Sequence, residues 1–241
     1  MAICCVPRES VASSVAMPGE LSVARVRLYR RFGLRPVAGL GGAAVYRARS
    51  LADADVADRA ALRALGIRTI IDLRADDERA RSPYRPEALT ALDVVSRPLR
   101  FRPQDGNAPD ARADDAVAAY GAPGERMTRL YRDLATRRDA LIAAVRTLER
   151  SPRPVVVHCV NGKDRAGVVC ALAQLRAGVD SDAVRADYLA ANDANRLMNE
   201  ADLAAEAPRR SPRELAVLQA MFEARPAYLD AFLDAFGPWD F

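Results

Sequence analysis

The sequence predicts an α/β protein with a mostly parallel β-sheet flanked by helices. Two apolar, β-branched runs, 67–73 and 154–158, indicate buried strands, and helical patterns lie before the first and after the second. Strands that alternate with helices build parallel sheets with helices packed on the faces. The chain has 241 residues, of which 50% are hydrophobic and 6% aromatic, so it can fill one core with mainly aliphatic side chains. We therefore expect a single domain over residues 1–241.

The first half of the chain begins with residues 1–20, which we expect to be a flexible N-terminus. Residues 54–65 predict a helix that ends at Gly66, and the strand 67–73 then carries Asp72 near its C-terminal end. A stretch further on is rich in Pro, Gly, Asp and Asn and predicts a flexible loop, which we expect to border the binding pocket of the protein. That loop, 102–115, contains four candidate acids that no spacing distinguishes: Asp105, Asp110, Asp114 and Asp115.

The second half is predicted to be mainly helical around the strand 154–158. Apolar side chains at helical spacing predict one long packing helix before this strand and a buried helix, ending at Gly178, after it. Ser211 and Glu214 form a capping-box pattern with proline at the first helical position. The expected helices are 126–150, 168–177, 181–192, 195–205 and one from 212 onward, and residues 195–241 form a helical extension of the same domain.

The composition argues against several classes of protein. A net charge of +4 and a pI of about 9.1 come without a dense basic block, so nucleic-acid binding is not expected. The chain has no run of eighteen apolar residues and no signal-peptide pattern, so we expect no stable membrane insertion and a cytoplasmic location, although secretion without a classical signal stays open. Four cysteines do not form the pattern of a disulfide framework.

One ten-residue segment concentrates the unusual residues. The chain's only histidine and its only lysine both lie in the segment His158-Cys159-Val160-Asn161-Gly162-Lys163-Asp164-Arg165-Ala166-Gly167. The other 35 of the 36 Lys and Arg residues are all arginine. Five residues separate Cys159 from Arg165, a spacing that lets a short loop surround a tetrahedral oxyanion between a sulfur nucleophile and a guanidinium. The segment therefore predicts phosphate-ester chemistry.

The predicted position of this loop, between a strand and the N-terminus of a helix, supplies a binding site for an anion. Backbone N–H groups and the helix dipole favour an anion there, and the same field favours the thiolate of Cys159 as a nucleophile. Arg165 can hold two phosphoryl oxygens in a fork. The residues expected to bind the substrate are Val160, Asn161, Gly162, Lys163, Ala166 and Gly167.

Four polar side chains have expected supporting roles. Lys163 is expected to add charge at the rim, and Asp164 to supply or remove a proton. His158 is expected to form a hydrogen bond with the backbone behind the loop. Asp72 has two open roles, as an alternative proton donor or as the partner of an arginine in a structural salt bridge.

The loop resembles the signature of cysteine-dependent phosphatases, and its Gly-Lys-Asp-Arg core is similar to that of the atypical bacterial tyrosine phosphatases of the protein tyrosine phosphatase B-like family. Segments 45–51, 65–79 and 186–192 extend the resemblance over roughly residues 35 to 195. It implies a cysteine-phosphatase-like fold and hydrolysis of phosphotyrosine, sometimes of phosphoserine, phosphothreonine or phosphoinositides.

The resemblance also implies roles for particular residues. Cys159 is the nucleophile, Arg165 the phosphate clamp and Asp164 the general acid, while Lys163 lies near additional phosphates of a lipid head group. The C-terminal helices of relatives can cover the active site, so the segment 195–241 is either part of the core or a lid.

Three positions depart from the family pattern. Ala166 replaces the hydroxyl residue that follows the arginine, which predicts slow hydrolysis of a phosphocysteine. Asn161 replaces a small residue. The stretch 33–39 replaces a segment that carries an aspartate in the family, so no role of that aspartate is expected here.

We therefore expect a phosphatase that needs no metal or cofactor and acts on a phosphorylated protein or a phosphoinositide through a phosphocysteine intermediate. One alternative is a weakly active or inactive module that binds phosphate groups. Another is thiol chemistry, such as sulfur transfer or arsenate reduction, which needs a resolving thiol near Cys159; Cys170 lies further along the predicted helix. The oligomeric state is not predicted.

Overall fold

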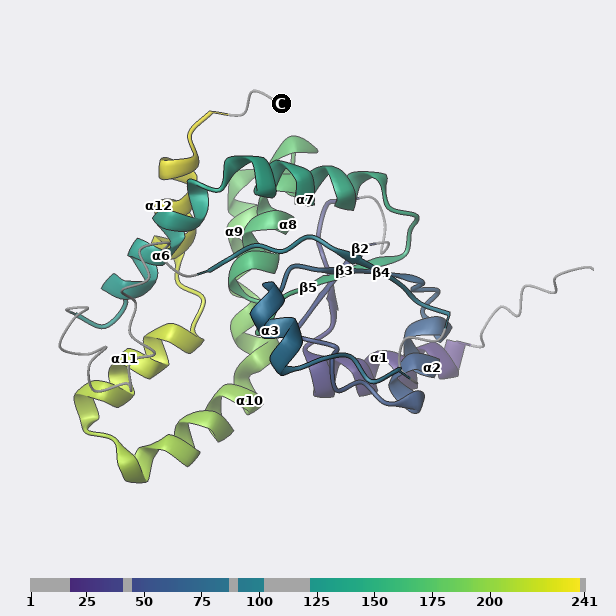
Figure 1. Ribbon diagram of the computed structural model, residues 1–241, viewed down its shortest axis with the longest axis horizontal. Helices are drawn as coiled ribbons and strands as arrows, with labels where there is room; N and C mark the ends of the chain where they lie inside the picture. Colours follow the sequence, from purple (N-terminus) through teal and green to yellow (C-terminus); the bar gives the residue numbers. More distant parts are fainter. Residues whose placement is uncertain (1–17, 41–44, 87–90, 102–121, 239–241) are drawn as a thin grey trace, which may run out of the picture.

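A five-stranded sheet in the order β1-β2-β5-β3-β4 forms the centre of the molecule (Figure 1). The structure, a computed structural model, describes residues 18–40, 45–86, 91–101 and 122–238. The edge strand β1 is antiparallel to β2, and all other neighbours are parallel. The strands are β1 (Arg35–Pro36), β2 (Val45–Ala48), β3 (Thr69–Asp72), β4 (Asp93–Ser96) and β5 (Val155–His158). This sheet confirms the predicted α/β fold class.

The parallel strands end in register. Ala48 pairs with His158, His158 with Asp72, and Asp72 with Ser96, so the last residues of four strands lie in one row across the sheet. The segment that follows each strand therefore starts at the same edge. In open α/β sheets this carboxyl edge is where ligands bind.

Alternate residues of the strands face two separate layers of helices. Val155 and Val157 pack into one apolar cluster, and Val156 between them packs into the other. Helices α1 (Pro18–Phe32) and α2 (Val56–Ala64) cover the face of Val156. The opposite face is covered by α7 (Arg138–Arg150) and α8 (Asp164–Arg176), with α9 (Ser181–Leu189) beyond them (Figure 1).

The C-terminal helices extend from this second layer. Helix α10 (Ala191–Glu206) leads through a short 3-10 turn (Ala207–Arg209) to α11 (Pro212–Phe222), and the two project from the sheet as an arm (Figure 1). Helix α12 (Pro226–Phe236) returns and packs along α6 (Glu125–Ala135). The predicted capping box is confirmed, because the Ser211 side chain accepts a hydrogen bond from the Glu214 N–H. No helix among the described ranges is long and apolar enough to cross a membrane.

The predicted long helix 126–150 is wrong, because two helices occupy that range. The Thr136 hydroxyl donates to the Asp133 carbonyl at 2.7 Å, and the Arg137 N–H donates to the Leu134 carbonyl at 3.1 Å. These short-range bonds close α6 with a tight turn. The apolar spacing continues across the break, so hydrophobic periodicity did not reveal it.

Other boundaries also differ from the expectation. The helices expected at 181–192 and 195–205 are α9, which ends at Leu189, and α10, which begins at Ala191. Helix α8 begins at Asp164 instead of residue 168. The sequence placed its start too late, because the first turn, Asp-Arg-Ala-Gly, is buried but has no large apolar side chain that would extend the helical pattern. Helix α1, which was not predicted, begins at Pro18, inside the expected flexible N-terminus. The rest of that N-terminus and the predicted loop 102–115 with its four candidate acids lie outside the described residues. A short helix, α3 (Asp76–Arg81), follows β3 beside the carboxyl edge.

Candidate active site

The loop after β5 is held tightly against the end of β2. The Ser50 N–H donates to the Val160 carbonyl at 2.9 Å. Gly162 has a φ of +60°, and a Cβ atom there would lie 2.3 Å from the Ala48 carbonyl oxygen. Both the backbone angle and the contact demand glycine. The chain thus reaches the start of α8 with Cys159 buried beneath the loop, at 1% exposure.

Arg165 lies in the first turn of α8 and binds Glu78 of α3. Its Nη2 donates to Glu78 Oε1 at 2.9 Å, and its Nη1 donates to Glu78 Oε2 and to the Leu99 carbonyl, the latter at 3.1 Å. Burial alone would lower the pKa of Arg165, but the hydrogen bonds and charge of Glu78 raise it. The guanidinium is therefore a fixed cation.

Arg165 keeps unused donors despite these contacts. Its Nε is buried and has no hydrogen-bond partner among the described residues. A guanidinium has five N–H groups, of which two are used by Glu78 and one by Leu99. The two that remain, on Nε and Nη2, point the same way and form the fork that suits two oxygens of a phosphoryl group.

Glu78 is itself fixed by the start of α3. Its Oε2 accepts a hydrogen bond from the Ala75 N–H at 2.8 Å, as the third helical residue of a capping box does. Burial would raise the pKa of Glu78, but Arg165 lowers it, so the carboxylate is ionised. Sequence reasoning placed Glu78 only within a family-like segment and gave it no role.

Lys163 points inward, so the expected position at the rim is wrong. Its side chain is 1% exposed, and its Nζ donates to Asp164 Oδ1 at 2.6 Å and to the Glu223 carbonyl at 3.1 Å. The ammonium also lies 5.8 Å from the centre of the Tyr228 ring. The physical reason is the Asp164 carboxylate, which attracts the Lys163 ammonium into the interior. There the ammonium is covered by the segment between α11 and α12. Binding of substrate by Lys163 stays a prediction.

Asp164 belongs to a buried chain of hydroxyl groups. Its Oδ1 also accepts a hydrogen bond from Tyr131 at 2.7 Å, and the Tyr131 hydroxyl lies 2.7 Å from that of Tyr188. Burial raises the pKa values of both tyrosines, which are therefore neutral and able to donate. Two donors thus fix the position of Asp164. Neither tyrosine was identified from the sequence, where both look like ordinary core residues.

His158 supports the loop from below, as expected. Its Nδ1 lies 3.0 Å from the Cys159 carbonyl oxygen, and its Nε2 meets the Tyr84 hydroxyl. Burial lowers the pKa of His158, so the imidazole is neutral at pH 7. The predicted hydrogen bond to the backbone is confirmed.

Asp72 forms the salt bridge, the second of its two expected roles. Arg74 donates from Nη2 to Asp72 Oδ2 at 2.8 Å, and both side chains are buried. Burial by itself would raise the pKa of Asp72, but the bonds from Arg74 outweigh it and the pKa is lowered. Asp72 Oδ1 lies 3.9 Å from His158 Nε2. Its carboxylate is thus committed to Arg74 behind the loop, which argues against the proton-donor role.

The remaining loop residues are placed as follows. Val160 is 38% exposed, and Ala166 is fully buried in the first turn of α8. The Asn161 carbonyl accepts a hydrogen bond from Asn195 of α10 at 3.0 Å. A Cβ atom on Gly167 would lie 3.1 Å from the Tyr188 ring, so close helix packing explains this glycine. The loop is thus tied to α10, which the sequence did not indicate.

Arg49 brings a second guanidinium to this edge. Its backbone nitrogen lies against Gly162, since a Cβ atom on that glycine would be 2.7 Å away. Its Nη1 is buried and has no hydrogen-bond partner among the described residues. Burial lowers the pKa of Arg49, while the charges of Asp202 and Cys159 oppose this effect. The loop is therefore surrounded by cations that lack a full set of partners.

The comparison with protein families fits this geometry. The model of the tyrosine phosphatase family matches residues 41–237, which include every strand from β2 onward and the whole loop. This chain belongs to the tyrosine phosphatase family. The resemblance inferred from the loop is thereby confirmed.

Two relatives within the family are similar over long stretches. The triple specificity protein phosphatase PtpB of Mycobacterium tuberculosis is 36% identical over 168 residues, which cover 62% of this chain and 61% of that protein. A putative tyrosine-protein phosphatase of Cupriavidus necator is 30% identical over 237 residues, or 95% of this chain and 83% of that protein. The chain thus matches somewhat less than two thirds of the length of the first relative.

A solved structure of Pseudomonas aeruginosa TpbA, a cysteine-to-serine variant in complex with phosphotyrosine, is also similar. It is 20% identical, with a TM-score of 0.31, and the match covers 74% of this chain and 85% of that one.

Proposed function

We propose that the protein is a cysteine-dependent phosphatase that hydrolyses phosphomonoesters, phosphotyrosine first among them, through a phosphocysteine intermediate. The observation that carries the proposal is the unused fork of Arg165, held by Glu78 in the first turn of α8 and six residues after Cys159. A thiol, a fixed cation and the positive end of a helix meet there. Such a combination suits a phosphoryl group in transfer.

The first step transfers the phosphoryl group to sulfur. The Cys159 thiolate attacks phosphorus, the bond between phosphorus and the ester oxygen breaks, and Asp164 in its protonated form gives its proton to the leaving oxygen. Arg165 binds two of the three equatorial oxygens through Nε and Nη2. Backbone N–H groups of the loop bind the third oxygen and compensate the charge that builds up in the transition state.

The second step releases phosphate. Water attacks phosphorus, Asp164 accepts the proton that water loses, and the bond between phosphorus and sulfur breaks to return the thiolate. A hydroxyl group beside the departing sulfur would help this step, but position 166 is alanine. We therefore infer that hydrolysis of the phosphocysteine is the slower of the two steps.

The position of Lys163 favours phosphotyrosine over phosphoinositides. An additional phosphate of a lipid head group needs a cation at the open side of the pocket, whereas this ammonium is occupied by Asp164 and the Glu223 carbonyl. The relative named for triple specificity motivates tests with phosphoserine, phosphothreonine and phosphoinositides as well. We also infer a reducing compartment such as the cytoplasm, because a nucleophilic thiolate has to stay reduced.

A binding module that captures phosphate groups without turnover is the second candidate, and the buried methyl group of Ala166 is the observation that favours it. Thiol chemistry has less support. Cys170 is fully buried in α8, and burial raises its pKa to about 12, so it is a poor resolving thiol.

The test is phosphate release from a phosphotyrosine peptide and a panel of phosphoinositides, in reducing buffer with a chelator. The wild type is compared with Cys159→Ser and with Cys170→Ala, which removes a buried thiol of the same chain. Turnover that disappears only in Cys159→Ser is the expected result. A wild type that binds phosphate but releases none from any substrate would instead identify the binding module.

A further inference from the structure

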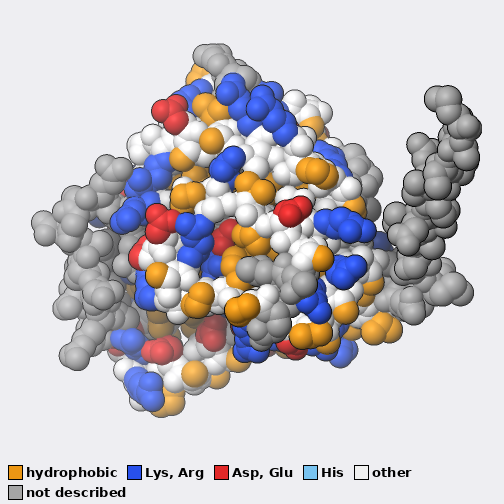
Figure 2. Space-filling view, turned by 45° about the vertical axis from the view of Figure 1, so that its right-hand side comes forward, with side chains coloured by type: hydrophobic (Ala, Val, Ile, Leu, Met, Phe, Trp, Pro, Cys, Tyr) orange, Lys and Arg blue, Asp and Glu red, His pale blue; other side chains and the backbone are white. Residues whose placement is uncertain are grey.

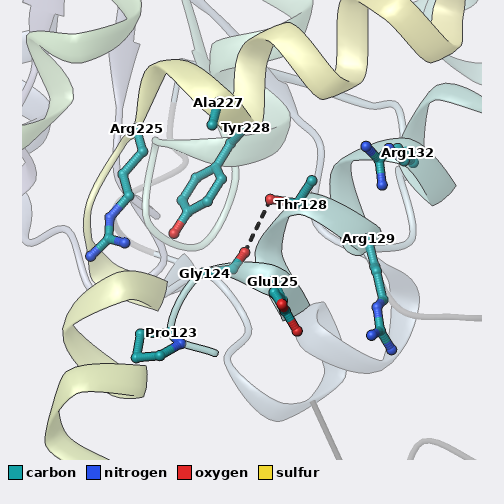
Figure 3. Close-up of a pocket in the computed structure, with 9 residues that line it drawn as sticks. All are labelled: Pro123, Gly124, Glu125, Thr128, Arg129, Arg132, Arg225, Ala227 and Tyr228. Atoms are coloured by element: carbon teal, nitrogen blue, oxygen red, sulfur yellow. Dashed lines mark hydrogen bonds between the residues drawn. The ribbon is translucent and has the colours of Figure 1, made fainter. Parts of the chain in front are cut away.

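A groove of about 470 Å³ lies outside the catalytic loop, between α6 and the start of α12. Figure 3 shows its lining: Arg129 and Arg132 project from α6, Arg225 stands on the opposite side, and the Tyr228 ring forms part of the wall between them. None of these four residues has a role in the chemistry proposed above. The groove is therefore a separate feature that needs its own explanation.

The charge of the groove is positive and partly uncompensated. Arg129 and Arg132 are exposed and form no hydrogen bond or ion pair within the part of the chain that the structure describes. Arg225 is paired with Glu223, at 2.9 Å from Nη2 to Oε2. Glu125 is the one acidic side chain among the described residues that line the groove. Arg129 and Arg132 thus give the lining an excess of positive charge over Glu125, while Arg225 is balanced by Glu223, and such a lining attracts anions.

The backbone keeps this groove open at one position. Gly124, which precedes α6, has a φ of +98°, and a Cβ atom there would lie 3.0 Å from the Tyr228 hydroxyl and 3.3 Å from Arg225 Nη1. A side chain would thus occupy the space between the two walls. Helix α6 also starts here without a side-chain cap, so its positive end faces the same region.

The groove and the catalytic loop share the Tyr228 ring as a common wall. Lys163 lies 5.8 Å from the centre of that ring, and its Nζ bonds to the carbonyl of Glu223, the residue that pairs with Arg225. Asp164 connects to the same wall through Tyr131, whose ring centre is 5.6 Å from that of Tyr228. The buried Tyr228 ring thus separates the arginines of the groove from the side chains that follow Cys159 in the loop.

We propose that this groove binds acidic residues of a protein substrate next to the phosphorylated side chain, and so selects phosphopeptides with acidic flanks. The proposal rests on the phosphatase function proposed above and names its substrate class more closely. Exposed guanidinium groups bind carboxylates in forked pairs and speed the approach of an anionic partner.

The arrangement of the arginines favours a peptide over a single phosphate or a membrane. Their guanidinium groups stand around the groove and do not converge on one point, as Figure 3 shows. Carboxylates spaced along an extended chain match such a distribution, whereas one phosphate group would use only one of the cations. Basic side chains elsewhere are mixed with acidic and apolar ones on the face in Figure 2, so that face has no continuous basic surface for a membrane.

The experiment compares two phosphotyrosine peptides that are identical except for flanking Glu or Gln residues. For the wild type, kcat/KM is expected to be roughly three- to tenfold higher for the Glu peptide at low salt, a range that fits two exposed ion pairs, and the preference should fall as salt is added. The double variant Arg129→Gln/Arg132→Gln should lose the preference. p-Nitrophenyl phosphate, which has no flanking residues, should react equally with wild type and variant.

Arg146→Gln/Arg150→Gln is the matched control. These two arginines are also exposed, on α7 near the end that leads into β5, and they form no hydrogen bond or ion pair with other described residues. The control removes the same charge from the opposite end of the sheet and should keep the preference for the Glu peptide. If both double variants lose it equally, the effect is one of net charge and the groove proposal is wrong.

The remaining outcomes separate the two proposals. Hydrolysis of p-nitrophenyl phosphate with no preference between the peptides would overturn the groove proposal and leave the phosphatase intact. No hydrolysis of any substrate would contradict the phosphatase itself. A double variant that loses activity on phosphoinositides in anionic vesicles, but keeps its peptide preference, would assign the arginines to lipid and likewise overturn the proposal.

Discussion

Arg165 and Glu78 are 87 residues apart in the chain and form a two-bonded ion pair at the carboxyl edge of the sheet. The carboxylate fixes the plane of the guanidinium and leaves its Nε free. In the proposed reaction, Glu78 thus acts only through Arg165, as a positioning residue. A fixed fork costs less entropy when it binds a phosphoryl group than a mobile arginine would.

Glu78→Gln should lower kcat/KM for p-nitrophenyl phosphate by roughly ten- to a hundredfold, because the neutral amide no longer holds the cation in place. Binding of inorganic phosphate should weaken as well, and the melting temperature should fall, because the buried guanidinium loses its charged partner. The control is Asp77→Asn, which removes the preceding carboxylate of α3, a group that pairs with the exposed Arg81. Equal losses of activity in the two variants would contradict the positioning role.

Gly162→Ala should abolish activity and strongly destabilise the loop. The added methyl group would meet the Ala48 carbonyl oxygen at 2.3 Å, in addition to the strain of a positive φ. Gly178→Ala separates these two effects, since Gly178 has a φ of +78° but no atom within 4 Å of the new methyl group. Gly178→Ala should cost about 1 kcal/mol in chemical denaturation and keep its turnover. Similar losses in both variants would mean that backbone strain alone explains Gly162.

Tyr131→Phe should lower kcat, because Asp164 then loses one of the two donors that fix its oxygen. The loss of a buried hydrogen bond should also reduce the free energy of unfolding by about 1 kcal/mol. Tyr228→Phe provides the comparison: it removes a hydroxyl that donates to the Ala220 carbonyl at 2.9 Å and touches no carboxylate. Steady-state measurement of kcat should show the loss in Tyr131→Phe and a value near that of the wild type in Tyr228→Phe.

Folding stability should decrease as the pH falls below about 6.5, the ordinary pKa of histidine. Burial lowers the pKa of His158 in the folded protein, so the unfolded chain binds a proton first and gains stability relative to the folded one. The loss begins near the unfolded pKa and ends once the folded-state pKa is passed. His158 is the only histidine in the chain, so urea unfolding of wild type and His158→Gln over this range isolates its effect. If the free energy of unfolding changes with pH in the same way in both proteins, the predicted contribution of His158 is wrong.

Ala166→Ser should speed hydrolysis of the phosphocysteine, because the new hydroxyl can donate to the departing sulfur. Rapid-quench measurement of the phosphoenzyme separates this step from its formation. Ala171→Ser adds the same hydroxyl to a buried position five residues further along α8 and should leave the step unchanged. An unchanged rate in Ala166→Ser would show that water or another group already serves the sulfur.

The sequence predicted those parts of the molecule that local patterns determine. Apolar runs predicted the strand before Cys159 and the buried helix after it, and both are present. The backbone preference of glycine predicted the ends of two helices, which are also found. The C-x5-R spacing located the loop because its residues are neighbours in the chain. The backbone bond of His158 was predicted for the same reason.

The contacts that hold the loop could not be predicted, because they join residues distant in sequence. Glu78, Tyr131 and Asn195 lie on three different helices, and no periodicity tells which polar or aromatic side chain turns toward the site. Lys163 was misplaced because two of the groups that enclose its ammonium, the Glu223 carbonyl and the Tyr228 ring, are known only once the C-terminal helices are positioned.

The row formed by Ala48, His158, Asp72 and Ser96 has a consequence for how the protein responds to its ligands. Segments that follow these strands supply the loop, Arg49 and the support for Arg165, so the complete anion site exists only when all four strands are aligned. An anion that binds there binds the native state alone and draws the folding equilibrium toward it, by about 2.7 kcal/mol at a concentration a hundredfold above its dissociation constant. Phosphate, the product of the proposed reaction, would thus also be a ligand that protects the sheet against unfolding.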